Sequence, residues 1–134
     1  MDRKSQSSFE MLVAFVVAII ILTPVVAHIL TLQTNYADSY KVSAAESAVN
    51  KLAEAADSIY LQGSPAKITV KLQFPEGIVE TRIKNNEILI RLSTSAGITD
   101  IFQITKEPVV GSLPIQSGLH KISVESKGDF VKIS

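Results

Sequence analysis

The feature that most constrains this chain is an apolar segment close to its N-terminus. No charged side chain occurs between Glu10 and Asp38, and residues 11–32 are apolar at almost every position. This stretch of 22 residues matches the roughly 20 that a helix needs to cross a bilayer. Arg3 and Lys4 precede it, so the positive-inside rule places the N-terminus in the cytoplasm and the rest of the chain outside. The sequence therefore predicts a membrane or export signal.

Three interpretations of this segment are open at this point. A cleaved secretory signal peptide would use the basic start, the apolar core 11–22, and Val25 and Ala27 as the small residues before a cut at His28. A plain single-pass anchor would keep the whole segment. A prepilin-type leader would be cut on the cytoplasmic side, so that the apolar segment stays in the mature protein.

Glu10, the residue just before the apolar segment, helps to distinguish these interpretations. An ionisable side chain at the edge of the hydrocarbon is costly and calls for a partner or a function. A secretory signal peptide has no use for such an acid. A purely structural interpretation also exists, because the dipole at a helix N-terminus stabilises an acidic side chain by roughly 0.3–1 kcal/mol.

The run from Lys4 to Leu12 resembles the processing motif of archaeal type IV pilin-like proteins with class III signal peptides. In that family a short basic leader ends in a small residue, and a prepilin peptidase leaves Gln as the first mature residue. Glu is the fifth mature residue, directly before a long apolar helix. The resemblance implies a cut between Ser5 and Gln6, with Ser5 standing where the family usually carries Gly or Ala. The matching positions are Lys4, Ser5, Gln6, Ser7, Ser8, Phe9 and Glu10.

The resemblance also implies roles for two residues in assembly. Glu10 would register subunits by pairing with the new α-amino group of a neighbour, or would be recognised by the peptidase or the platform protein. Pro24 would bend the helix so that neighbouring helices pack in a filament core. Pro24 is equally a residue that membrane helices tolerate without any special role.

A second helical pattern follows the apolar segment. Apolar residues recur at spacings of three and four between 40 and 60, which indicates an amphipathic helix with a stripe of small side chains. Gly63 and Pro65 predict its end, and Thr34 and Asn35 are positions where the helix could be interrupted. The stripe consists of Ala45, Val49, Leu52, Ala56 and Ile59.

From residue 66 the apolar period changes to two, which is typical of half-buried strands. Asn85 and Asn86 predict a tight hairpin turn, 93–97 a polar loop, and 108–118 a long connection. The expected fold class is α+β: a long N-terminal helix, hydrophobic and then amphipathic, followed by an antiparallel β-sandwich-like domain of five to six strands. The expected strands are 68–74, 79–84, 88–92, 98–105, the region around 122–124, and 130–133.

Composition and motifs argue against nucleic-acid binding, metal binding and catalysis. Thirteen basic and thirteen acidic residues give zero net charge, which disfavours nucleic-acid binding. The absence of Cys excludes disulfides, thiolate metal sites and cysteine catalysis. His28 and His120 are far apart in the sequence and belong to no catalytic or metal-binding motif. We expect no catalytic residue, no cofactor and no metal.

Together these observations predict a prepilin leader at 1–5, a transmembrane and filament-core helix at 6–32, an amphipathic continuation at 33–62, and an extracellular β domain at 66–134. The expected function is that of a structural subunit of an archaeal type IV-like pilus. Its partners would be further copies of the chain, a prepilin peptidase, the membrane before assembly, and the pilus assembly platform. Its location would be the cell membrane and then the cell-surface filament. Alternatives are a minor pilin or anchored accessory protein, and a secreted β domain released by signal peptidase.

Overall fold

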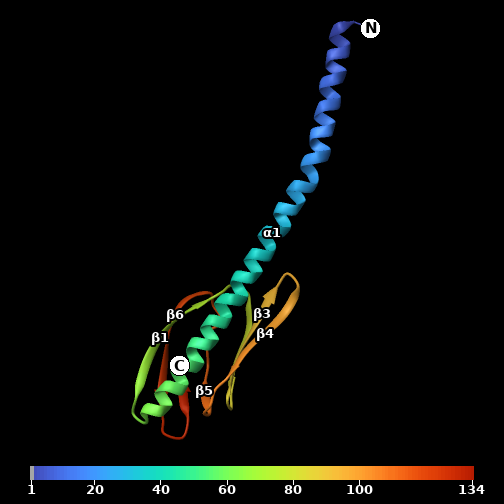
Figure 1. The fold of residues 1–134 in the computed structure, drawn as a ribbon. Helices are drawn as coiled ribbons and strands as arrows, with labels where there is room; N and C mark the ends of the chain where they lie inside the picture. The colour runs from blue at the N-terminus through green and yellow to red at the C-terminus, as the bar shows by residue number, and fades with distance from the viewer. Residues whose placement is uncertain (1) are drawn as a thin grey trace. The chain divides into compact units, whose positions relative to one another are not determined.

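A computed structural model describes residues 2–134 of the chain (Figure 1). These residues form one long helix and seven strands. The chain divides into two compact units, Met1–Ala37 and Asp38–Ser134, and α1 begins in the first unit and ends in the second. The elements are α1 Arg3–Gln62, β1 Lys67–Phe74, β2 Ile78–Lys84, β3 Glu87–Thr94, β4 Gly97–Ile104, β5 Val109–Gly111, β6 Gly118–Ser126 and β7 Val131–Ile133.

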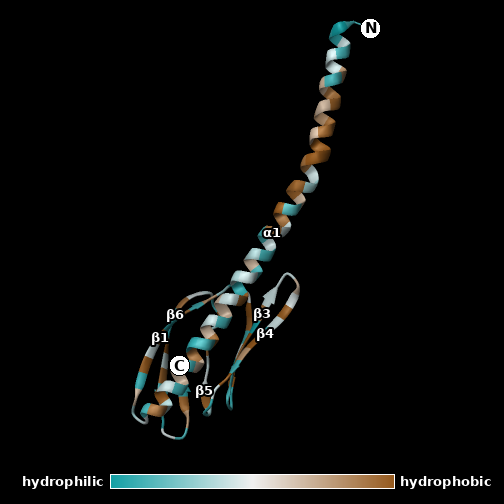
Figure 2. Cartoon of the chain, viewed as in Figure 1, coloured by the Kyte–Doolittle hydropathy of each residue, from teal (hydrophilic) through white to brown (hydrophobic). Residues whose placement is uncertain are grey.

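The first unit consists of the N-terminal part of α1, and every residue from 2 to 37 is exposed. Figure 2 shows the apolar residues clustered along this part of the helix. The expected interruption at Thr34 and Asn35 is wrong, because the helix is continuous there. Threonine hydroxyls are satisfied within the helix: Thr34 Oγ1 donates to the Leu30 carbonyl at 3.0 Å.

In the second unit, the remaining part of α1 packs against both sheets through one stripe of its surface. The spacing of three and four keeps these residues on one face of the helix. Four of the seven are alanines, which allow the helix to approach closely. The buried residues of α1 are Ala45, Ala48, Val49, Leu52, Ala53, Ala56 and Ile59, which include the whole expected stripe.

The strands form a four-stranded sheet with the order β1-β6-β7-β5 and a three-stranded sheet with the order β2-β3-β4. The turn at Asn85 and Asn86 is confirmed: it joins β2 to β3, and Asn85 has a φ of 56°, which Asn tolerates. The core lies between α1 and the inner faces of both sheets, where Leu72, Ile90 and Val124 are fully buried. The expected α+β class is therefore correct.

Three details of the expected sheet are wrong. The connection 108–118 contains an additional strand, β5, and this strand pairs with β7 in the parallel direction. The loop expected at 93–97 is only a two-residue turn, because β3 reaches Thr94 and β4 begins at Gly97. Gly111 explains why β5 fits: a Cβ there would lie 1.8 Å from the Ile133 carbonyl oxygen, so only glycine permits this close approach.

Candidate functional site

The segment that carries the processing motif lies in the first turns of α1. The helix begins at Arg3, so the proposed leader is not a separate extended peptide. The backbone N–H groups of Ser5 and Gln6 donate to the Asp2 carbonyl at 3.0 and 3.2 Å, and Ser5 Oγ donates to the same oxygen at 2.9 Å. The bond between Ser5 and Gln6 therefore lies inside the first helical turn.

This position keeps the bond accessible. Lys4, Ser5 and Gln6 are exposed, as are the other residues of the motif. The first turn of a helix is its least stable part, because several of its N–H groups have no partner within the helix. A peptidase that requires an extended substrate would have to break only the contacts to Asp2 and the first few helical hydrogen bonds.

Glu10 lies in the third turn of α1, beyond the first turn in which the helix dipole stabilises an acid. The structural interpretation of Glu10 as a helix N-terminal acid is therefore wrong for the intact chain. The first turn contains no acidic side chain at all, because the helix starts with Arg3 and Lys4. Glu10 is exposed in the structure, as are all its neighbours in the first unit.

The apolar part of α1 is long and apolar enough to cross a membrane or to act as a signal sequence, and none of its most apolar stretch is buried by the chain itself. Phe9, Ile20 and Leu30 are each more than half exposed. Pro24 lies inside this stretch, and the helix continues through it. Exposed apolar surface of this extent marks a contact with membrane or protein.

The second unit contains a network of charges that the sequence did not reveal. On the outer face of the β2-β3-β4 sheet, Arg91 bonds Asp100 through Nε at 2.7 Å and through Nη2 at 3.0 Å, and its Nη1 lies 3.0 Å from Glu80 Oε2. The hydrogen bond from Arg91 lowers the pKa of Asp100, and the same bond raises the pKa of Arg91. Detecting this network requires the strand register, in which Arg91 faces both Glu80 and Asp100.

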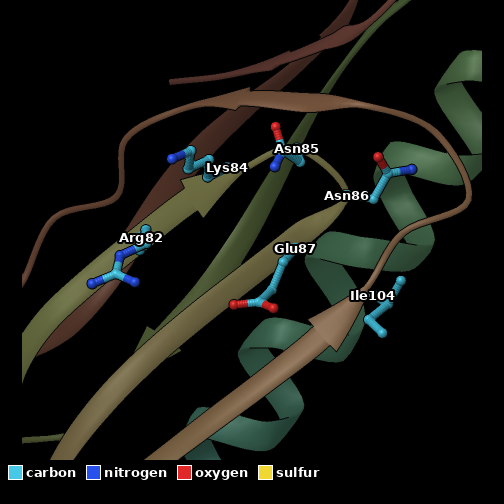
Figure 3. A pocket seen from close by; sticks show the side chains of 6 residues that line it. All are labelled: Arg82, Lys84, Asn85, Asn86, Glu87 and Ile104. Atoms are coloured by element: carbon cyan, nitrogen blue, oxygen red, sulfur yellow. The ribbon is translucent and has the colours of Figure 1, made fainter.

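A hollow of about 330 Å³ lies beside the turn between β2 and β3 (Figure 3). Its side chains extend along the sheet surface rather than converging on one point. Asn86 Nδ2 donates to the carbonyl oxygens of Thr105 and Lys106 at 3.3 and 3.2 Å, which ties the turn to the end of β4. The hollow is lined by Arg82, Lys84, Asn85, Asn86, Glu87 and Ile104.

The two histidines belong to different units of the chain. His28 lies in the apolar part of α1, while His120 lies on β6, where its Nε2 is 2.9 Å from the Gln116 carbonyl oxygen. Across residues 2–134 there is no group of three or more His, Asp or Glu side chains arranged to hold a metal ion.

No protein-family model, curated protein or solved structure matches the chain. The order of its parts is nevertheless informative. A long apolar N-terminal helix followed by a β-rich C-terminal region is consistent with a pilin-like fold.

Proposed function

We propose that the chain is a structural subunit of an archaeal type IV pilus-like filament. One observation carries this proposal: the β-rich unit completes its own core, whereas the apolar residues of the first unit are all exposed. A filament of parallel helices gives that apolar surface a permanent partner. In this proposal the chain is the substrate of a peptidase and not an enzyme.

The energetics of this proposal depend on what surrounds the helix. In the membrane, lipid solvates residues 11–32 as well as other helices would, so apolar burial alone does not drive association there. Once the helix leaves the membrane, each large aliphatic side chain left in water would cost about 1.5–3 kcal/mol. About ten such side chains make an exposed helix untenable, so extraction from lipid and burial among sister helices must occur together.

In this proposal the residues of the processing motif act one after another. A prepilin peptidase cuts between Ser5 and Gln6, and Gln6 carries the new α-amino group. Glu10 is one turn further along the mature helix, where its carboxylate pairs with the α-amino group of a neighbouring subunit as that subunit joins. The platform protein drives this insertion, and the β unit faces outward for surface attachment.

N-terminal sequencing of the mature protein tests the proposal. A chain that begins at Gln6 supports the pilin assignment. A start at His28 would instead indicate a secreted β domain, and an intact Met1 would indicate a plain anchor. Electron microscopy of cells that lack the protein then separates a major subunit, whose loss removes the filaments, from a minor or accessory component, whose loss changes their number or length.

Substitutions at the cut should block processing. Ser5→Leu places a large side chain where a small one is needed, and Gln6→Ala removes the expected first mature residue. Both variants should accumulate in the membrane fraction as precursor, which gel mobility and N-terminal sequencing detect. Ser7→Ala, which keeps a small residue at a position where the family accepts one, is the matched control and should be processed normally. Normal processing of both test variants would contradict the assigned cut.

A further inference from the structure

The edge of β4 differs from the other sheet edges. Edge strands usually carry Lys, Pro or a bulge, or are very short, because unpaired backbone groups invite pairing with other chains. β2 has an irregularity between Ile78 and Glu80, β5 has only three residues, and β1 carries Lys67 and Lys71. β4 has eight residues, no Lys, no Pro and a continuous register along β3.

The free backbone groups of β4 can be identified. The N–H of Thr105 donates to the Asn86 carbonyl on the side of β3. Because the groups of successive residues point to opposite sides of a strand, those of Ile98, Asp100, Phe102 and Ile104 face away from β3. Three of these four residues are large and apolar, and each is more than half exposed. A hollow of about 450 Å³ separates this edge from α1, where Glu46 and Asn50 contribute to its lining.

The edge of β1 presents a matching row of groups. The N–H of Ser126 donates to the Ala66 carbonyl on the side of β6, so the backbone groups of Lys67, Thr69, Lys71 and Gln73 face away from that strand. β1 also has eight residues. A smaller hollow of about 180 Å³ lies between β1 and α1, and its lining includes Lys51.

The two edges run in opposite directions within the second unit. β4 begins beside Asp38, whose carboxylate accepts a hydrogen bond from the Ser95 N–H. It ends near Asp57, whose carboxylate accepts a hydrogen bond from the Lys106 N–H. β4 therefore runs in the same direction as α1. β1 begins just after the end of α1 and returns along it, and Figure 1 shows the two strands on opposite sides of this part of the helix.

We propose that β4 pairs edge to edge with β1 of a second copy of the chain. The proposal rests on the proposed function, in which the α1 helices of neighbouring copies run in the same direction. Under that condition, β4 of one copy and β1 of the next are antiparallel. Full overlap of the two eight-residue strands pairs Ile98 with Gln73, Asp100 with Lys71, Phe102 with Thr69, and Ile104 with Lys67 of the second copy.

Charge favours the pairing of β4 with β1 over the pairing of two β1 edges. The β4 side carries Glu46 and Asp100, and the β1 side carries Lys51, Lys67 and Lys71. Pairing β1 with another β1 would bring lysines together, so like charges disfavour that symmetric contact. At the β4 edge Arg91 already bonds Asp100, and Arg91 and Arg82 both bond Glu80, so the preference of β4 for the basic β1 edge comes mainly from Glu46. A contact between two different surfaces repeats without closing when its rotation does not close a ring, which is the geometry of a filament.

The same register would also cover apolar side chains that are exposed in the single chain. On the inner face, full overlap places Gln103 beside Ile68 and Ile101 beside Val70 of the second copy. Ile68 is 44% exposed although it points toward the core side of its sheet. Pairing with β4 would cover this side chain as well as the outward-facing Phe102.

Engineered cysteines test the pairing in the full chain, which has no native cysteine to interfere. Gln103 and Ile68 are both exposed, and the proposed register makes them a non-hydrogen-bonded pair, in which the Cα atoms approach to about 4.5 Å. A chain that carries both Gln103→Cys and Ile68→Cys should form a ladder of dimers, trimers and higher multimers on a non-reducing gel of the cell-surface fraction. Reductant should collapse the ladder to monomer.

Three controls make the result specific. Gln103→Cys alone and Ile68→Cys alone should remain monomeric, and a dimer from either would indicate a symmetric contact and overturn the proposal. Gln103→Cys combined with Gln73→Cys should give no ladder, because residue 73 lies about 16 Å further along β1 at roughly 3.3 Å per residue. The pair Phe102→Cys and Thr69→Cys tests the same register on the outer face, in case the first pair disturbs folding.

The outcome separates this inference from the proposed function. Accumulated protein with reactive thiols but no ladder from either pair overturns the edge pairing, whether or not filaments form. A ladder without filaments supports the edge pairing and contradicts the filament role. A ladder between this chain and a different protein would show that the occupant of the β4 edge is not a second copy.

Discussion

Arg91 engages two carboxylates on the outer face of the β2-β3-β4 sheet, and its planar guanidinium suits this task. The two bonds to Asp100 use the fork of the side chain, and the remaining nitrogen reaches Glu80. Lysine offers a single point charge and could not reproduce this arrangement. The side chains are partly exposed, so salt weakens the interaction. The network orients three neighbouring strands more than it stabilises them.

Asp100 should titrate below its ordinary pKa of 3.8, because the charged form accepts two bonds from Arg91. Because the pKa of Asp100 is lower in the folded chain than in the unfolded chain, its ionisation stabilises the fold above about pH 4. This contribution is lost as the pH falls through the pKa of the folded chain. Carboxyl NMR titration of the detergent-solubilised chain measures the effect. In Arg91→Lys the pKa of Asp100 should rise toward 3.8, whereas Glu125, whose pKa is lowered by Lys127, should not change. Titration of Asp100 above 3.8 in the unsubstituted chain would contradict this assignment.

The contrast between Asn85 and Arg91 shows what single residues reveal in a sequence. Asn85 and Asn86 predict a turn by themselves, because few residues tolerate positive φ. The partners of Arg91 depend on the register of three strands, which no single residue specifies. The second role of Asn86, as a donor to Thr105 and Lys106, depends on a segment nearly twenty residues away.

At the scale of elements, α1 combines two patterns that the sequence separates well. Its first part is mainly apolar and its second part has a stripe at helical spacing, so the sequence predicts both patterns, although the helix is not interrupted at Thr34 and Asn35 and the buried stripe also contains Ala48 and Ala53. The short strand β5 was not, because three residues cannot display an alternating pattern. β5 exists because Gly111 lets its backbone approach β7, and that is a property of the packed sheet.

Two leucines of α1 test the division between buried and exposed faces. Leu52 is fully buried, while Leu61 is 85% exposed. Leu52→Ala should lower the free energy of unfolding by about 2–5 kcal/mol, because it removes core contacts and leaves a cavity. Leu61→Ala, the same substitution in the same helix, should change it by less than about 0.5 kcal/mol. Denaturant titration followed by tertiary-structure signals measures both. Equal effects would contradict the assigned core.

At the scale of the whole molecule, the balance of charges in the composition conceals an uneven distribution. Basic residues line the β1 edge and acidic residues lie near the β4 edge, although the net charge of the whole chain is zero. The apolar surface is divided in the same uneven way between the two units. The sequence shows the apolar segment directly, but the edges emerge only once the strands are ordered. In the proposed function, the apolar helix surface and the strand edges both contact other copies of the chain.

Glu10 provides the most direct test of assembly as distinct from processing. Its carboxylate lies beyond the helix dipole and faces outward, so its removal should leave folding and cleavage unchanged. Glu10→Gln removes the charge but keeps the size. We expect a chain that is cut between Ser5 and Gln6 at the normal rate, stays in the membrane and yields several-fold fewer filaments, as counted by electron microscopy and by shearing from cells.

The matched control is Asp2→Asn, which removes the other acidic side chain of the N-terminal segment. In the proposed function Asp2 belongs to the leader and is absent from the mature subunit, so its substitution should leave the filament yield unchanged. If both variants lost filaments equally, the N-terminal charge would act before cleavage, in recognition by the peptidase or in membrane insertion. If neither did, the pairing of Glu10 with a neighbouring α-amino group would be wrong, and the apolar surface of the helix would suffice to align the subunits.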